Sequence, residues 1–234
     1  MHYVFVDEAY SRTGTCTKIA VASWAVEQAT WDRQVERLAE LYNSPVLRSL
    51  ASMFDALGAR ARISTADLEN TLFRSGETDG TDDIPRMART DNIWSQCALF
   101  AVSGLIRDLV EAGQKIGTVD IYCDPKSLKR EHFEAIEGTF RRLVVSGVKA
   151  YANTRHSRLF RTFAIRGIEL VKKPEAGHRP NKFQAGTWVA DKLCTNSEEV
   201  ARMNPKRITT YDISYVVRNS LSKSCCQTWK QGRI

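Results

Sequence analysis

The chain lacks the segments that mark membrane, secreted and modular proteins. It has no run of about 18 uncharged apolar residues, which argues against a transmembrane helix. Asp7 and Glu8 interrupt its first apolar run before the hydrophobic region of a signal peptide could form. No Gly/Ser-rich or Pro-rich linker divides its 234 residues. We therefore expect one soluble, cytoplasmic domain over residues 1–222, followed by a basic tail over residues 223–234.

Several common kinds of chemical site are also missing. The six cysteines include no C-x-x-C pair, which argues against a structural zinc site. There is no glycine-rich phosphate loop. The four histidines are scattered, so no Ser-His-Asp or Cys-His arrangement can be argued from the sequence. His156 and His178 lie in polar segments, where either could transfer a proton near a phosphate or be an ordinary surface histidine.

Positive charge is in excess and is concentrated in one segment. Lysine and arginine number 34 against 27 acids, a net charge of +7, which attracts polyanions. Residues 141–166 contain no acid and carry aromatic side chains among seven basic ones: Arg141, Arg142, Lys149, Arg155, Arg158, Arg161 and Arg166. Such a mixture suits a phosphate backbone with base stacking, so we expect nucleic acid as a partner. A solvated helix end followed by a loop would have the same composition.

The hydrophobic periodicity predicts alternating strands and helices. Strands are expected at 3–6, 15–26, 60–64, 119–123, 149–152 and 160–171. Helices are expected within 28–60, at 92–112, after Pro125, at 181–194 and at 208–221, with a polar loop at 75–92. This order predicts a mixed α/β sheet with helices on its faces.

Two predicted central strands end in an aspartate. Asp7 follows the first buried run, and Asp124 follows the run at 119–123. Because successive side chains of a strand face opposite ways, only one of Asp7 and Glu8 can point into a given site. Both positions also have a structural interpretation, since Asp7 and Glu8 could mark a polar turn and Asp124 before Pro125 is typical of a helix start.

A late helix carries polar residues along one face. At helical spacing, Gln184, Thr187, Trp188 and Asp191 lie on the same side of the helix predicted at 181–194. A surface helix with scattered polar residues would show the same pattern. Carboxylates from separate elements are the ligands preferred by Mg²⁺ and Mn²⁺, and two such ions about 4 Å apart can promote phosphodiester cleavage.

The two ends of the chain carry a family resemblance. The opening Phe5-Val6-Asp7-Glu8-Ala9-Tyr10 and the helix from Gln184 to Asp191 resemble the bacterial and phage family called domain of unknown function 3800. Members of that family open with Asp-Glu-Ser-Gly and end with a Gln-x-Ala-Asp helix. The resemblance implies a ribonuclease-H-like mixed sheet with helices on both faces, here with extra helical insertions. It also implies carboxylates from the first strand, a central strand and a late helix, which Asp7, Asp124 and Asp191 match.

The chain departs from the family pattern at both ends. Ala9 and Tyr10 replace Ser-Gly, and Thr187 stands where the helix should carry its aspartate. Asp191 lies one helical turn later, about 6 Å along the axis, and could supply the carboxylate instead. Otherwise the acid is lost and the site is degenerate.

The main hypothesis is a nuclease that uses Mg²⁺ or Mn²⁺, with two divalent ions possible, on RNA or DNA. Asp7, Asp124 and Asp191 would ligate metal, and Glu8 would be a fourth ligand or an orienting group. Gln184 and the basic residues from Arg141 to Arg161 would bind the substrate. One alternative is a nucleic-acid-binding protein with a degenerate site. Another is a phage or mobile-element accessory protein that acts through a protein partner.

Overall fold

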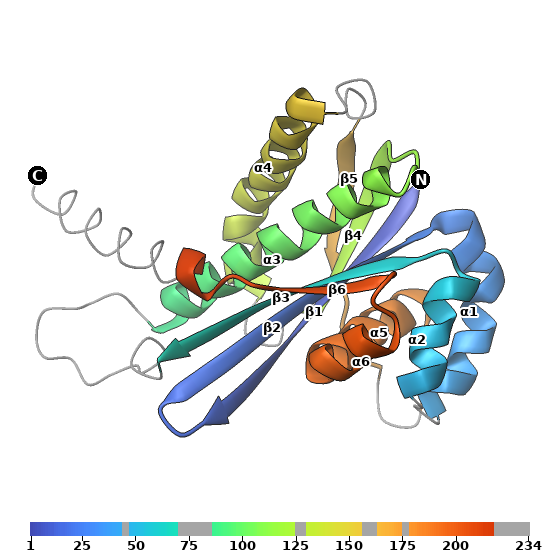
Figure 1. Cartoon of the computed structure of the whole chain (residues 1–234), viewed down its shortest axis with the longest axis horizontal. Coiled ribbons are helices and arrows are strands. Elements are labelled where there is room, and N and C mark those ends of the chain that lie inside the picture. Colours follow the sequence, from blue (N-terminus) through green and yellow to red (C-terminus); the bar gives the residue numbers. More distant parts are fainter. Residues whose placement is uncertain (44–46, 70–85, 125–129, 156–162, 175–177, 218–234) are drawn as a thin grey trace, which may run out of the picture.

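The structure, a computed structural model, describes residues 1–43, 47–69, 86–124, 130–155, 163–174 and 178–217. Its centre is one six-stranded sheet in the order β5-β4-β1-β2-β3-β6 (Figure 1). The strands are β1 (His2–Thr13), β2 (Cys16–Glu27), β3 (Arg60–Glu69), β4 (Thr118–Asp124), β5 (Ala164–Leu170) and β6 (Ile208–Asp212). The helices are α1 (Gln28–Asn43), α2 (Leu47–Ala56), α3 (Arg86–Glu111), α4 (Arg130–Arg155), α5 (Lys182–Thr195) and α6 (Ser197–Met203).

β1 pairs antiparallel with β2 on one side and parallel with β4 on the other. β1, β2 and β3 form an antiparallel meander, whose first turn contains Gly14 at a φ of 60°. β4 and β5 run parallel to β1, and β6 runs parallel to β3 at the far edge. α1 and α2 are inserted between β2 and β3. The predicted mixed α/β sheet with helices on both faces and extra helical insertions is confirmed.

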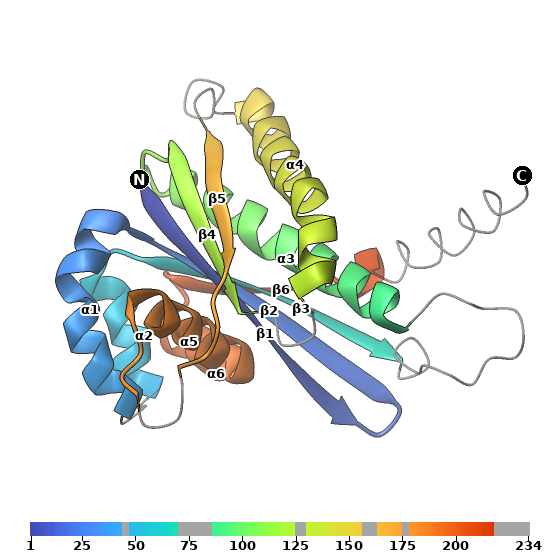
Figure 2. The ribbon, with the colours of Figure 1, turned by 180° about the vertical axis from the view of Figure 1, so that it is seen from behind.

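The two faces of the sheet have separate cores (Figures 1 and 2). Val4 and Val6 of β1 point to the side covered by α3 and α4, where they join one apolar cluster. Tyr3 and Phe5 point to the side of α1, α2, α5 and α6, where they join the other. This alternation follows from the two-residue period of a strand that is buried on both faces. Side chains at odd positions of β1 therefore contact one layer of helices, and side chains at even positions contact the other.

α3 is the core helix of the first layer. Among the described residues it contains one segment, Ile93–Glu111, that is long and apolar enough to cross a membrane by length and composition alone. Trp94, Cys97, Leu105 and Leu109 of this segment are fully buried within the protein. Packing against the sheet accounts for the high apolar content of the helix.

Two predicted elements are wrong in type. The strand expected at 149–152 belongs to the last turns of α4, whose Val144 and Val148 lie four residues apart and are both buried. The helix expected at 208–221 begins as strand β6, because its backbone pairs with β3 from Ala61↔Ile208 onward. Both errors arise where tertiary packing overrides a short apolar pattern that fits either type.

Other predicted boundaries shift. β3 is twice as long as the five residues expected, and α3 begins at Arg86, inside the segment expected to be a loop. α6 was not predicted. Most of the predicted polar loop and the whole basic tail at 223–234 lie outside the described residues.

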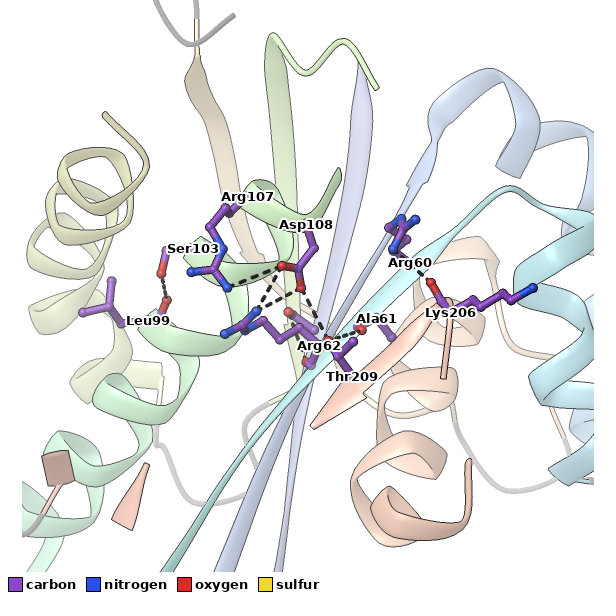
Figure 3. A network of polar contacts seen from close by, with 10 residues as sticks. Arg60, Ala61, Arg62, Leu99, Ser103, Arg107, Asp108, Lys206 and Thr209 are labelled. Carbon is purple, nitrogen blue, oxygen red and sulfur yellow. Dashed lines mark hydrogen bonds and ion pairs between the residues drawn. The ribbon is translucent and has the colours of Figure 1, made fainter. Parts of the chain in front are cut away.

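A buried ion pair joins α3 to the sheet (Figure 3). Arg62 of β3 donates through Nη1 to both carboxylate oxygens of Asp108, at 3.1 and 3.0 Å. The guanidinium also lies 3.5 Å from the centre of the Tyr211 ring, and Thr209 donates to Asp108 Oδ2 at 3.4 Å. A Cβ at Gly104 would stand 2.1 Å from Arg62 Nε, so glycine there leaves room for the arginine. Through these contacts, the ion pair connects both helix α3 and edge strand β6 to strand β3.

Candidate functional site

Asp7 and Asp124 are neighbours on two central strands. They are register partners in the parallel β1–β4 pair, and β4 ends at Asp124 while β1 continues to Thr13. Register partners on adjacent strands point to the same face, and Asp7 shares the parity of Tyr3 and Phe5. Both carboxylates therefore lie on the face covered by α5. Asp7 is 1% exposed, and Asp124 is half-buried.

Several contacts hold Asp7 in place. Its Oδ1 accepts a hydrogen bond from the Glu8 backbone N–H at 2.7 Å. The Cys194 thiol of α5 donates to the Asp7 carbonyl at 3.0 Å and accepts from the Ala22 N–H at 3.1 Å. Helix α5 is thereby connected to the backbone on which the first candidate ligand stands. A residue held by such bonds is preorganised for a ligand.

α5 packs unusually close to the sheet. A Cβ at Gly186 would stand 2.2 Å from Phe5 Cε1, so only glycine permits this approach without displacement. The Trp24 indole donates to the Gly186 carbonyl at 2.8 Å across the same contact. The helix begins with a capping box, in which Asn181 Oδ1 accepts from the N–H groups of Phe183 and Gln184. The close approach sets the polar face of α5 beside Asp7 and Asp124.

These elements enclose one small cavity of about 150 Å³, which we call the acid cavity. Asp7, Asp124 and Asp191 all line it. The other lining residues are Lys173, Pro174, Gln184, Thr187 and Trp188. The three acids that were singled out from three distant parts of the sequence are thus brought to one cavity. Their roles as metal ligands stay a prediction.

The negative charge of this region acts on two buried thiols. Burial raises the pKa of the Cys123 thiol well above its usual range, and the charges of Glu8, Asp7 and Asp124 raise it further. Burial likewise raises the pKa of the Cys194 thiol, with Asp7 adding to the effect. Both cysteines are therefore neutral thiols, and neither is a nucleophile of the thiolate kind.

Gln184 lines the acid cavity, but its amide group is engaged by the protein. Oε1 accepts from the Asn181 backbone N–H at 2.9 Å and completes the capping box. Nε2 donates to the Lys172 carbonyl at 2.9 Å. The side chain therefore ties the start of α5 to the segment that carries Lys173 and Pro174. Direct substrate binding by Gln184 stays a prediction, and its visible role is to position that segment.

Thr187 and Asp191 occupy successive turns of the same helix face. Thr187 is 3% exposed, and its hydroxyl donates within its own helix, at 3.3 Å to Phe183 O and 3.1 Å to Gln184 O. It supplies no carboxylate. Asp191 lines the cavity with one oxygen 3.5 Å from Lys192 Nζ. The acid of α5 that reaches the cavity is therefore the one predicted as a substitute.

Glu8 lies on the other face of the sheet. It shares the parity of Val4 and Val6, is fully buried, and accepts a hydrogen bond from the Trp94 indole of α3 at 3.2 Å. It is absent from the described lining of the acid cavity. The strand alternation that places Asp7 in the cavity places Glu8 behind the sheet. A ligand role for Glu8 would need another arrangement of β1.

Most of the predicted basic residues that are described lie on α4, in the layer opposite the acid cavity. Arg141 donates to the Ile165 carbonyl at 2.7 Å and pairs with Glu137 at 2.8 Å, so it braces strand β5. Arg142 and Lys149 are exposed on the same helix, whose last residue is Arg155. Arg158 and Arg161 lie outside the described residues.

Sequence reasoning missed Lys173. It is exposed and is the one cation among the described residues that line the acid cavity. It follows β5 in a run of two lysines and a proline, which carries no recognisable signal by itself.

The buried Asp120 lies on the same strand face as Asp124 but is paired by the Arg166 guanidinium. Asp120 is therefore a structural acid.

The described acids do not yet form a compact metal site. No group of three or more His, Cys, Asp or Glu side chains among the described residues is gathered closely enough to hold an ion. The donor set nevertheless fits a divalent cation in kind, since it consists of carboxylate oxygens beside an amide and a hydroxyl.

Comparisons with known proteins add little. No family model matches the chain, and no curated protein matches it. Among solved structures, ribonuclease H2 from Pyrococcus horikoshii OT3 covers 88% of this chain and 77% of its own, at 11% identity and a TM-score of 0.41. A similarity at this level carries no argument about activity. The resemblance to domain of unknown function 3800 stays a prediction.

Proposed function

We propose that this protein is a metal-dependent nuclease that hydrolyses phosphodiester bonds of RNA or DNA at the acid cavity. The single observation that supports the proposal most is the common position of Asp7, Asp124 and Asp191. Two of them are register partners on adjacent strands, and the third reaches the same cavity from α5. Carboxylate oxygens from separate elements are the ligands that Mg²⁺ and Mn²⁺ prefer, so this arrangement suits a divalent cation.

Mg²⁺ or Mn²⁺ is the proposed cofactor, held by Asp7, Asp124 and Asp191. When bound, such ions activate a water and stabilise the leaving oxygen in phosphodiester cleavage. The rigid backbone contacts of Asp7 keep its carboxylate in place, which lowers the cost of assembling the site. The volume of about 150 Å³ accommodates ions and a phosphate group but is small for a whole nucleotide.

Lys173 is the proposed phosphate-binding residue. Lys173 lines the same cavity as three aspartates, and Gln184 fixes the adjoining Lys172 carbonyl. A cation in this place can attract the phosphodiester and offset its repulsion from the acids. The exposed basic residues of α4 would bind the polynucleotide only where it passes around the β5 edge of the sheet to the opposite face.

The alternative is a nucleic-acid-binding protein with a degenerate site. Two observations favour it: Thr187 stands where the resemblance places an acid, and the described residues form no compact metal cluster. An accessory role through a protein partner makes no distinct prediction for the acid cavity.

Cleavage and metal binding together test the proposal. Purified protein should degrade a labelled oligonucleotide with Mn²⁺ or Mg²⁺ and not with EDTA. Asp7→Asn and Asp124→Asn should each reduce kcat at least about 100-fold, because each removes a proposed ligand. Asp120→Asn is the matched control, since it removes an acid from the same strand face outside the cavity. Wild-type protein that binds nucleic acid but neither binds Mn²⁺ calorimetrically nor cleaves would establish the degenerate binder instead.

A further inference from the structure

Trp188 of α5 is the one aromatic residue among the described residues that line the acid cavity. It is half-buried, whereas Trp24, Trp31 and Trp94 are fully buried. Those three donate their indole N–H groups to acceptors inside the protein and belong to its cores. Trp188 is therefore an aromatic surface that borders the proposed metal ligands.

The surface of α5 passes from the wall of the cavity to its rim between Thr187 and Trp188. Both residues line the cavity, but Thr187 is 3% exposed and its neighbour is half-buried. Gln184 and Asp191, four residues before and three residues after Trp188, also line the cavity and are also half-buried. Residues at these spacings share one face of a helix. Trp188 therefore stands at the open side of the cavity, between Gln184 and Asp191.

The Trp188 side chain is supported by the protein on part of its surface. It packs against the apolar cluster of the α5 layer. The Lys192 ammonium lies 5.9 Å from the centre of the ring and 3.5 Å from Asp191 Oδ2. A distance of about 6 Å is the outer limit of a cation–π contact, so a base can replace the lysine over the ring at little cost. The ring is thus held by the core and binds Lys192 only weakly.

The size of the acid cavity places most of a nucleotide outside it. A volume of about 150 Å³ accommodates ions and a phosphate group, so the sugar and the base beside that phosphate lie at the rim. Pro174 and Trp188 are the apolar members of the described lining. Aromatic side chains bind nucleobases by stacking with little regard to sequence. A base beside the phosphate in the cavity therefore has Trp188 as its stacking surface.

We propose that Trp188 stacks on the nucleobase next to the phosphodiester bond that is cleaved, and that the substrate is single-stranded at this position. A base inside a duplex has neighbours on both faces, so it must leave the helix before it can stack on a protein ring. The inference rests on the proposed function for the class of ligand. It adds that Lys173 and Trp188 bind neighbouring parts of one nucleotide, the phosphate by charge and the base by stacking.

Removing the ring and removing the bases in turn tests the inference. Binding of a fluorescein-labelled oligothymidine, and of an abasic chain of the same length, is measured by anisotropy with Ca²⁺ in place of Mg²⁺. Trp188→Leu should weaken binding of the oligothymidine about tenfold, the order of one lost stacking contact, and change binding of the abasic chain less than about twofold. Trp188→Phe keeps an aromatic ring and should lose less than about threefold.

Tyr215→Leu is the matched control. Tyr215 is 77% exposed, and the described lining of the acid cavity does not include it. Its substitution should change binding of either chain less than about twofold. An oligothymidine loss equal to that of Trp188→Leu would show that any exposed aromatic residue contributes, and it would overturn the inference.

The abasic chain separates stacking from structural damage. A displaced α5 would weaken binding of both chains equally, whereas a lost stacking contact weakens only the chain that has bases. Equal losses for the two chains, or an equal loss for a blunt duplex, would overturn the inference. If Trp188→Leu does not fold, wild type and Trp188→Phe are compared by fluorescence. Oligothymidine, but not the abasic chain, should then quench the emission that Trp188→Phe lacks, and an absence of this quenching would overturn the inference.

The outcomes also distinguish this inference from the proposed function. A base-dependent loss in Trp188→Leu, with no metal-dependent cleavage by the wild type, would support the stacking site and contradict the nuclease. Cleavage by the wild type without a base-dependent loss would support the nuclease and overturn the stacking site. A complete lack of binding by the wild type would overturn the stacking site as well.

Discussion

Two groups of charged residues lie on opposite faces of the same sheet and differ in how their charges are arranged. On the α3 face, Arg62 and Asp108 have opposite signs and satisfy each other within a network (Figure 3). On the α5 face, Asp7, Asp124 and Asp191 have the same sign and line a cavity with one lysine. The two opposite charges neutralise each other, so removing either one would leave the other buried without its counter-ion. Carboxylates from β1, β4 and α5 that line one cavity are the oxygen ligands that a divalent cation prefers, and this makes the α5 face the candidate site.

The largest loss of stability is expected when the ion pair between Arg62 and Asp108 is broken. Asp108→Asn leaves Arg62 buried with a neutral partner, because both side chains are largely buried, at 7% and 13% exposure. Removing one partner of such a pair should lower the free energy of unfolding by about 3 kcal/mol, measured by urea denaturation. An Arg62→Met/Asp108→Leu double variant should recover most of that loss. A loss below about 1 kcal/mol for Asp108→Asn would show that solvent screens the pair.

The next effect concerns the close approach that forms the acid cavity. Gly186→Ala places a methyl group against the Phe5 ring, where its Cβ would stand 2.2 Å from Cε1. Overpacking of this kind should cost about 2 kcal/mol and displace α5 from Asp7. Gly138→Ala on α4 is the control, because nothing lies within 4 Å of its Cβ and alanine favours a helix. Thermal unfolding of both variants would compare them, and similar melting temperatures would contradict the packing argument.

A smaller effect is expected at the one cation of the cavity. Lys173→Ala should raise KM for an oligonucleotide about tenfold, with a lesser change in kcat, because it removes an attraction for phosphate. Lys172→Ala is the matched control, since Lys172 is the neighbouring exposed lysine, is not among the described residues that line the cavity, and is bonded by Gln184 through its backbone carbonyl. Steady-state kinetics of the two variants would decide. An equal effect of both substitutions would indicate general surface charge.

The smallest expected change in stability is that of Asp7→Asn, and it distinguishes the acids of the cavity from the paired charges of Arg62 and Asp108. Asp7→Asn removes one of several like charges, so it should raise the free energy of unfolding by roughly 0.5–1 kcal/mol while activity is lost. The asparagine oxygen can still accept the Glu8 N–H. Differential scanning calorimetry without metal measures the change. If Asp7→Asn lost 2 kcal/mol or more, Asp7 would belong with Asp108 among the structural acids.

The candidate acids could be found from the sequence because each stands where a strong local pattern ends. Asp7 and Asp124 follow buried strand patterns, and Asp191 shares a helical face with Gln184. Position within a strand also indicated that Asp7 and Glu8 face opposite ways, which the Trp94 contact of Glu8 bears out. Sequence could not place the basic residues, because Arg141 braces β5 in the opposite layer.

Whether some segments form a strand or a helix could not be predicted from the local sequence pattern. The segment at 208–212 becomes a strand because an edge of β3 is available to pair with it, and that edge exists only after the sheet has formed. Lys173 reaches the acid cavity because Gln184 ties the chain beside it, a contact across 12 residues. Neither pairing leaves a periodic signal in the segment concerned.

By itself, the sequence determined the alternation of strand and helix through most of the chain and the strand ends that carry Asp7 and Asp124. These depend on the hydrophobic pattern of neighbouring residues, which can be recognised within a short stretch of sequence. Only the tertiary structure decided that Asp124 lies in register with Asp7, that Gly186 lets α5 approach them, and that Lys173 lines the same cavity. Such contacts join residues far apart in the chain, and their geometry exists only once the layers have packed.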